Sequence, residues 1–301
     1  MFRNYIWPFI VLSMLATCDA LQQGRSSGLD IEPFSAIETT LTPDSYNAKV
    51  QQSSTKVMIS TGRKTTEVID LADSNVKCED LEDFPISIDA AIGANLASTP
   101  IICGGLYLTR DNLTIDLDHS SDICFKYMEG AWQQFATMNE RRHYAAGIVY
   151  DNALHIFGGY DQNTNTRLQS SEIVKEDGSS TEGPPLPTPI HGHAIASINS
   201  TVSIITGGRT NINNYSDKTW YFNHTSQEFQ PGPNLLEGRY HHSSGYVIDQ
   251  ETKERIVIIA GGYDSNGYFN STEMLLNGEW KTGKTHKETN ICSFLVPLPR
   301  H

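Results

Sequence analysis

The chain has 301 residues and a formal net charge of −13, with 22 Lys and Arg against 35 Asp and Glu. No run of basic residues forms a stripe along it, which argues against nucleic acid and against an anionic membrane surface as partners. The length is sufficient for one large domain.

Residues 1–20 have the pattern of a secretory signal peptide. Arg3 provides a positive start, an apolar run follows, and the small residue Ala20 ends the segment. The apolar run is too short to span a bilayer and no later segment is long enough, so we expect no membrane span. A bacterial lipidation site at Cys18 is a less favoured alternative, because the residue before it is larger than such a site accepts. Residues 21–50 are polar and are interpreted as a loose leader, and residues 51–299 are predicted to form the folded domain. The predicted signal peptide implies that this domain is secreted.

From residue 51 onward, apolar strands that end in glycine recur along the chain. The last glycine of each strand is separated from the next by 43, 54, 49 and 54 residues. A period near 50 with a double glycine closing an apolar strand is typical of a propeller blade. Glycine has no Cβ and therefore fits where a strand turns sharply beside a crowded neighbour. These glycines are Gly62, Gly104, Gly105, Gly158, Gly159, Gly207, Gly208, Gly261 and Gly262.

Two further markers share this period. A marker residue precedes each closing glycine by 27 to 33 residues, and the four markers are Cys78, Trp132, Ser180 and Phe229. A Thr/Ser-Glu strand follows the glycines in three repeats, whereas the repeat closed by Gly208 has Trp220 where the others have Glu. We expect each blade to contain four strands, with the marker at the start of its repeat.

This layout resembles the kelch-repeat family of β-propellers over roughly residues 55 to 297. The resemblance implies an all-β, kelch-type β-propeller of four-stranded blades, with four complete repeats. Two partial pieces remain, residues 56–76 and 280–297. They either pair in a shared fifth blade that closes the ring, or belong to a truncated six-bladed propeller. Truncation is favoured, because kelch propellers usually have six or seven blades.

Four cysteines remain after the signal peptide. Cys103 ends a second strand and Cys124 lies in the next strand of the same repeat, so we expect a disulfide between these antiparallel neighbours. Cys78 is interpreted as a buried free thiol, and the state of Cys292 stays open. No spacing resembles a zinc site, so no metal is predicted. Five sequons predict N-glycosylation, at Asn112, Asn199, Asn214, Asn223 and Asn270.

Histidines cluster just before the predicted innermost strands. A metal site is one interpretation of this cluster, and packing imposed by the repeat is the favoured one. Copper radical oxidases that share the kelch fold need a cysteine cross-linked to a tyrosine, which this sequence does not reproduce. We therefore predict no catalytic residue and no cofactor. The histidines are His143, His191, His193, His241 and His242.

The loops after the glycine pairs are polar and contain tyrosines, a composition common in recognition surfaces. We expect a non-catalytic, secreted glycoprotein scaffold that binds an extracellular protein or glycan through these loops. The alternative is an extracellular carbohydrate-active enzyme, an oxidase or an epimerase. The candidate binding residues are Tyr107, Tyr160, Asp161, Tyr215, Tyr263 and Asp264.

Overall fold

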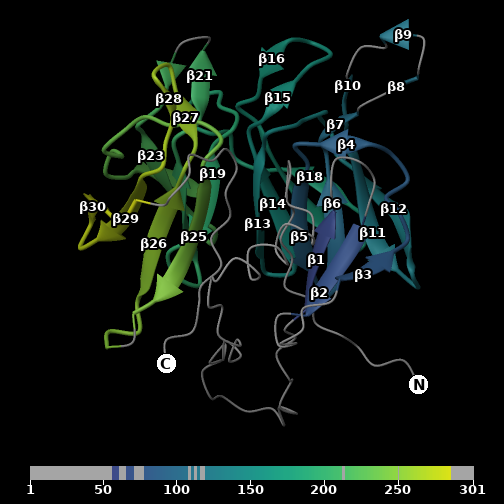
Figure 1. Ribbon diagram of the computed structural model, residues 1–301, viewed down its shortest axis with the longest axis horizontal. Coiled ribbons are helices and arrows are strands. Elements are labelled where there is room, and N and C mark those ends of the chain that lie inside the picture. Colours follow the sequence, from purple (N-terminus) through teal and green to yellow (C-terminus); the bar gives the residue numbers. More distant parts are fainter. Residues whose placement is uncertain are drawn as a thin grey trace.

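The computed structural model describes residues 56–60, 66–70, 78–107, 110–111, 114–115, 119–211, 214–249 and 251–285. Within these residues all regular secondary structure is β-strand, and the strands form antiparallel sheets arranged side by side as the blades of a β-propeller (Figure 1). The predicted all-β propeller fold is thereby confirmed. The predicted signal peptide, the leader and Cys292 lie outside the described residues.

Four complete blades are described, each with four antiparallel strands in sequence order. Blade 2 contains β5 (Ile92–Leu96), β6 (Thr99–Cys103), β11 (Ile123–Met128) and β12 (Ala131–Thr137). Blade 3 contains β13 (Ala146–Tyr150), β14 (Ala153–Phe157), β17 (Ser171–Lys175) and β18 (Ser180–Glu182). Blade 4 contains β19 (Ala194–Ser197), β20 (Val202–Thr206), β23 (Thr219–Asn223) and β24 (Glu228–Pro231). Blade 5 contains β25 (Ser243–Ile248), β26 (Arg255–Ala260), β29 (Thr272–Leu276) and β30 (Glu279–Thr282).

The predicted start of each repeat is wrong by one strand. Trp132, Ser180 and Phe229 lie in β12, β18 and β24, which are the closing strands of the preceding blades. The physical reason is visible at Trp132, whose indole N–H donates to the Thr66 hydroxyl at 3.0 Å. The closing strand thus contacts the preceding blade. The period of the sequence repeat does not by itself show which strand begins a blade.

The N-terminal piece forms a three-stranded blade 1, with β1 (Lys56–Ser60), β2 (Thr66–Asp70) and β3 (Cys78–Leu81). This agrees with three strands that lack an innermost one, and places the marker Cys78 in the closing strand. Trp280, predicted to begin a further partial repeat, instead lies in the closing strand β30 of blade 5. The predicted pairing of residues 291–296 with blade 1 concerns a segment outside the described residues.

The hydrophobic core lies between neighbouring blades. Inner strands β5, β13, β19 and β25 contact one another in sequence order. Between blades 2 and 3, Ile92 and Ile101 pack with Leu154 and Ile156. Between blades 4 and 5, Ile204 belongs to one apolar cluster with Val257, Ile259 and Trp280. The second strands of blades 2 to 5 are mostly buried, which explains why each of them is an almost continuous apolar run.

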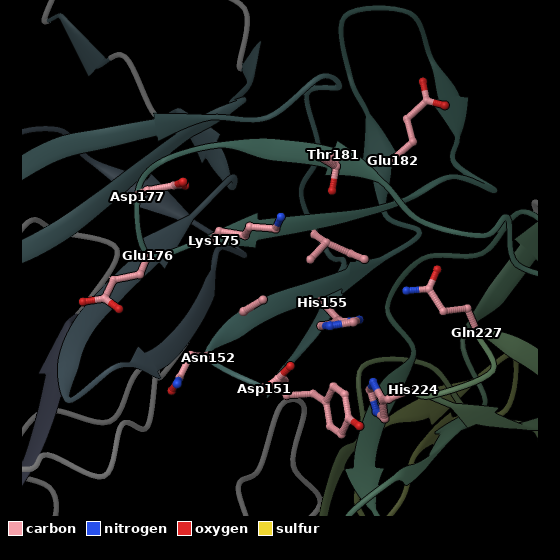
Figure 2. Close-up of a pocket in the computed structure, with 13 residues that line it drawn as sticks. Asp151, Asn152, His155, Lys175, Glu176, Asp177, Thr181, Glu182, His224 and Gln227 are labelled. Carbon is pink, nitrogen blue, oxygen red and sulfur yellow. The ribbon is translucent and has the colours of Figure 1, made fainter.

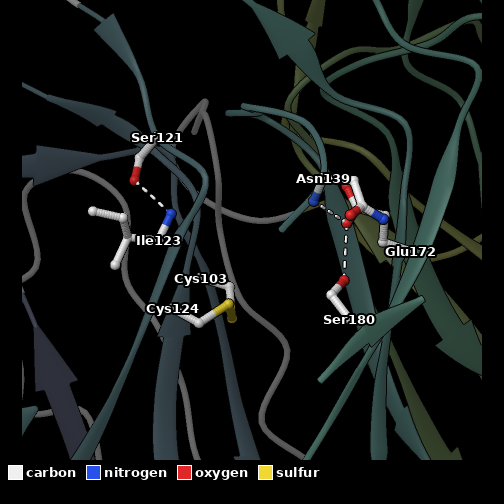
Figure 3. Close-up of a disulfide and its surroundings, with 7 residues drawn as sticks. All are labelled: Cys103, Ser121, Ile123, Cys124, Asn139, Glu172 and Ser180. Carbon is white, nitrogen blue, oxygen red and sulfur yellow. Dashed lines mark hydrogen bonds between the residues drawn. A yellow bond between two sulfur atoms is a disulfide. The ribbon is translucent and has the colours of Figure 1, made fainter. Parts of the chain in front are cut away.

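The predicted disulfide between Cys103 and Cys124 is present (Figure 3). The two residues lie directly opposite each other on β6 and β11, with their Cα atoms 4.1 Å apart. Both are fully buried in the cluster between blades 2 and 3. The bond therefore links the second and third strands of a single blade and does not join two blades.

The glycine pairs join one blade to the next. Both glycines of each described pair have positive φ, for example +58° at Gly158 and +108° at Gly159. The amide of Gly159 donates to the carbonyl of Ile190 in the next blade at 2.9 Å, and Gly105 and Gly208 donate to Arg142 and Arg239 in the same way, each at 2.8 Å. A Cβ on Gly158 would lie 2.5 Å from that carbonyl oxygen, so only glycine permits the approach.

Two blades contain a buried arginine–glutamate pair. Arg142 donates to Glu172 at 2.6 Å in blade 3, and Arg239 donates to Glu273 at 2.7 Å in blade 5. Each guanidinium also donates to the carbonyl of the first glycine in its own blade's pair, at 2.7 and 2.9 Å. This accounts for the recurring Glu of the third strand. In blade 4 the equivalent positions hold Ile190 and Trp220, which belong to one apolar cluster.

Candidate binding face

The segments after the glycine pairs are short two-stranded hairpins, where loops were predicted. They are β15 (Tyr160–Asp161) with β16 (Thr166–Arg167), β21 (Arg209–Asn211) with β22 (Asn214–Tyr215), and β27 (Tyr263–Asp264) with β28 (Gly267–Tyr268). In blade 2 the same region holds β7 (Leu106–Tyr107), paired with β4 (Ile88–Asp89) and β10 (His119–Ser120), and the pair β8 (Arg110–Asp111) and β9 (Thr114–Ile115). The hairpins stand together at one end of the blades (Figure 1). Two-residue strands carry no periodic pattern, so the sequence did not indicate them.

The hairpins are held against the segments that enter the inner strands. His143 and Tyr160 exchange two backbone hydrogen bonds, at 3.0 and 2.9 Å. Equivalent bridges join His191 to Arg209 and Tyr240 to Tyr263. The first tyrosine or arginine of each hairpin is therefore fixed by its own blade, and its side chain is positioned on a rigid frame.

A chain of backbone hydrogen bonds crosses the blades at this end. Tyr144 donates to the Ala90 carbonyl at 3.0 Å, Gly192 donates to Tyr144 at 2.8 Å, and His241 donates to Gly192 at 2.9 Å. All four residues occupy the same place before the inner strand and all have positive φ, 51° at Tyr144 and 55° at His241. This conformation is rare for large side chains, and such outliers cluster at functional sites.

A continuous cluster of rings extends over blades 3, 4 and 5, and we call seven of its members the aromatic platform. Its members are Tyr144, Tyr160, His191, Tyr215, Tyr240, His241 and Tyr263. Tyr240 stacks on His241 with ring centroids 3.7 Å apart, and His241 lies 4.1 Å from Tyr144. Tyr160, Tyr215 and Tyr263, predicted as binding residues from three separate loops, are thus brought into one cluster.

Gly192 creates the space for this platform. A Cβ on Gly192 would lie 2.0 Å from the Tyr240 ring and 2.7 Å from the His241 ring. Blades 3 and 5 place Tyr144 and His241 at the equivalent position, and these two rings meet because blade 4 contributes no side chain between them. The sequence analysis missed Tyr144 and Tyr240, although Tyr144 directly follows His143 and Tyr240 directly precedes His241 of the predicted histidine cluster.

Two arginines flank the aromatic platform. The Arg167 guanidinium lies 5.7 Å from the centre of the Tyr160 ring, and that of Arg209 lies 5.6 Å from the Tyr215 ring. Within the described part of the chain, Arg167 is paired with no carboxylate. The sequence analysis also missed these arginines, because nothing in their spacing separates them from ordinary surface charges.

Burial keeps the imidazoles of this end neutral. Desolvation, with Arg167 as the next cause, lowers the pKa of His191 to about 3. Desolvation, followed by the His143 and Arg209 charges, lowers the pKa of His241 to about 3. Burial also lowers the pKa of His193 to about 4. The aromatic platform therefore presents neutral rings beside permanently charged guanidinium groups at physiological pH.

These pKa values predict a loss of stability in mild acid. An imidazole with a lowered folded-state pKa stabilises the fold fully above its unfolded pKa near 6.5, and that contribution is lost as pH falls toward 3. The slope is about 1.4 kcal/mol per pH unit for each buried neutral histidine. We expect the melting temperature to fall by at least about 5 °C between pH 7 and pH 5. A His193→Gln variant should show a shallower dependence in the same thermal melts, and an unchanged melting temperature across this range would contradict the prediction.

The two predicted aspartates serve mainly to shape their hairpins. Asp161 accepts hydrogen bonds from the Asn163 amide at 2.9 Å and the Thr164 hydroxyl at 3.0 Å. Asp264 accepts from the amide and side chain of Asn266 in the same manner. These are Asx turns, which fix the hairpin tip. Both carboxylates therefore stabilise the frame that carries the tyrosines.

Tyr107 lies apart from the aromatic platform. It packs against the cluster of Phe84, Ile102 and Trp132 between blades 1 and 2, and its hydroxyl accepts a hydrogen bond from Ser121. The structure thus separates one of the six predicted residues from the others. The reason is that blade 2 pairs its hairpin strand with β4 and β10, which turns this segment toward the core.

The described sequons occupy different surroundings. Asn199, Asn214 and Asn270 are exposed, which is the condition that N-glycosylation requires. Asn223 is half-buried, and its side-chain oxygen accepts hydrogen bonds from Thr225 and Ser226. Asn112 lies outside the described residues.

Three of the clustered histidines bond to groups of their own or the preceding blade. His143 contacts the Ser120 hydroxyl at 2.8 Å, His242 contacts the Thr206 hydroxyl at 2.8 Å, and His191 donates to the Arg209 carbonyl at 3.1 Å. Among the residues with described positions, no three His, Cys, Asp or Glu side chains are grouped so that they could hold a metal ion. His143 and His242 therefore join neighbouring blades, and His191 bonds within its own blade.

The chain matches none of the protein families and none of the curated proteins with which it was compared. It is similar in fold to the solved structure titled "Structure of YjhT", with a TM-score of 0.67 and 13% sequence identity. The similarity covers 77% of this chain and 80% of YjhT. At this identity the likeness concerns the fold alone. Within the described ranges, no helix is long and apolar enough to cross a membrane.

Proposed function

We propose that the protein is a secreted, glycosylated β-propeller of the kelch-repeat type that binds an extracellular protein or glycan through the aromatic platform. The observation that carries the proposal is the set of half-exposed tyrosine and histidine rings that three blades bring together. Tyr144, Tyr160, Tyr215, His241 and Tyr263 all retain partial solvent exposure. Large apolar rings that remain exposed on a rigid frame favour a recognition surface.

The backbone supports this role. Tyr144 and His241 are held in a left-handed conformation by the interblade hydrogen bonds, so the rings are ordered before any ligand arrives. Preorganised aromatic side chains lose little conformational entropy on binding. Aromatic rings beside hydroxyl, amide and guanidinium groups suit both sugar faces and protein side chains.

The predicted signal peptide at residues 1–20 and the sequons support export. Exposure of Asn199, Asn214 and Asn270 agrees with glycans at these positions. A secreted product from mammalian cells that loses mass on deglycosylation is therefore the appropriate material for binding studies.

The test is a glycan array together with a pull-down from extracellular fluid, using this secreted protein. Tyr215→Ala and Arg167→Ala should each weaken capture by about tenfold, because central aromatic and arginine contacts dominate recognition surfaces. Matched controls are Tyr246→Ala and Arg255→Ala, which remove a tyrosine–arginine pair 4.3 Å apart on blade 5, away from the aromatic platform.

Thermal melts of all four variants separate lost binding from lost folding. Equal loss of binding in the platform variants and the controls would contradict the proposal. Chemical turnover of a captured sugar by the purified protein would favour a carbohydrate-active enzyme instead.

A further inference from the structure

A second surface lies at the opposite end of the blades. An open cleft of about 900 Å³ is lined by the turns that connect β13 to β14, β17 to β18, and β23 to β24 (Figure 2). The hairpins of the aromatic platform leave β14 at Phe157, whereas this cleft begins at Ala153, at the other end of the same strand. The volume is in the range that accommodates a small molecule or a few side chains.

Two imidazoles and a phenol ring line one side of the cleft. His155 and His224 lie next to each other with ring centroids 5.0 Å apart (Figure 2). The Tyr150 ring stacks on His224, with ring centroids 4.5 Å apart. Both histidines are nearly buried, with 6% and 5% of their surfaces exposed. Burial lowers the pKa of both, that of His224 to about 4, so both rings are neutral at physiological pH.

The hydrogen-bonding capacity of these rings is not used up within the described residues. Ser203 bonds the Nε2 atom of His224 at 2.8 Å, but the Nδ1 atom has no partner there. For His155, neither ring nitrogen is bonded to any residue of the described chain. A buried polar atom without a partner, such as His224 Nδ1, is uncommon in folded proteins and indicates a missing water or ligand. A neutral imidazole has one nitrogen without a proton, so the His155 ring retains a hydrogen-bond acceptor.

Carboxylates line other parts of the same cleft. The exposed side chains of Asp151, Glu176 and Glu182 line the cleft, and none of them forms an ion pair or hydrogen bond with a described residue. Asp177 also lines it, but its carboxylate accepts hydrogen bonds from Ser179. Lys175 is the single cation among the lining residues, so the cleft has a strong excess of negative charge.

We infer that this cleft binds an organic cation, an ammonium or guanidinium group that is paired with the rim carboxylates and donates a hydrogen bond to the His155 imidazole. The Tyr150 ring offers a face for cation–π contact. Neutral acceptors, free carboxylates and an aromatic face are the complementary chemistry for such a group. A metal ion fits less well, because the described residues hold no cluster of three ligands.

The group could belong to a free amine or to a basic side chain of another protein, so the test uses both. Isothermal titration of the full secreted protein with spermidine and, separately, with a short Arg- and Lys-containing peptide should reveal a saturable site. Glu182→Gln, Asp151→Asn and His155→Phe should each weaken it by at least about fivefold. The charge-matched controls are Glu251→Gln and Glu254→Gln, which lie in the exposed turn between β25 and β26.

The inference is supported if either probe binds, if the cleft variants weaken that binding and if the control variants keep it. The probe that binds then identifies the source of the cation. Glu182 and Asp151 are exposed, so their variants remain informative if His155→Phe fails to fold. No saturable binding of either probe would overturn the inference. Equal weakening by the cleft and control variants would also overturn it, because general attraction to a protein of net charge −13 would then suffice.

Discussion

Replacing Glu172 by Ala should destabilise the protein by about 3–5 kcal/mol and lower its melting temperature by roughly 10 °C. The Glu172 carboxylate is buried and accepts hydrogen bonds from the Asn139 amide and the Ser180 hydroxyl (Figure 3). It also accepts hydrogen bonds from the Arg142 guanidinium and the Glu140 amide. Its loss leaves the fully buried Arg142 guanidinium without its main counter-charge. Thermal and chemical denaturation measure the effect.

The control lies in the same network. Glu140 also approaches Arg142, at 3.3 Å, but its side chain is 47% exposed, so Glu140→Ala should cost less than about 1 kcal/mol. A second variant copies blade 4, which has Ile190 and Trp220 at the equivalent positions. Arg142→Ile combined with Glu172→Trp should recover part of the stability, because it removes the unpaired charge. Equal stability of Glu172→Ala and Glu140→Ala would refute this account of the buried pair.

The blade architecture was accessible from sequence because its determinants are local. A glycine pair needs no partner to be recognised, and its spacing fixed the four complete blades. Cys103 and Cys124 were predictable for the same reason, since strand neighbours within one repeat follow from the repeat itself. The first strand of each blade could not be predicted, because a repeating pattern has the same period whichever strand is taken as its start. Trp132 contacts the preceding blade only in three dimensions.

The candidate sites were less predictable than the blades. Three tyrosines of the aromatic platform were identified from loop composition, but Tyr144 and Tyr240 were missed. Their positions depend on left-handed backbone at Tyr144 and on the space beside Gly192, and the sequence does not show which rings meet there. The cleft at His155 was missed altogether. Its residues come from three turns of two blades and share no spacing.

Replacing Gly158 by Ala should separate blades 3 and 4 locally and lower the free energy of unfolding by about 3 kcal/mol or more. The new Cβ would meet the Ile190 carbonyl oxygen at 2.5 Å and the His193 ring at 3.0 Å, and the neighbouring hydrogen bond from Gly159 to Ile190 would be lost. Left-handed backbone alone accounts for roughly 1–2 kcal/mol of this penalty.

The Gly130→Ala variant is the control that separates the backbone conformation of glycine from the close contact between the blades. Gly130 has a φ of +87°, also left-handed, but no atom lies within 4 Å of the position where its Cβ would be. This variant therefore has the unfavourable backbone conformation without the clash, and its free energy of unfolding should fall by only about 1 kcal/mol. Hydrogen exchange should report faster opening of the Gly159 amide in Gly158→Ala, and no change there in Gly130→Ala. If the two variants melted at the same temperature, the glycine pairs would be required for backbone conformation alone, and the close approach of neighbouring blades would contribute nothing to stability.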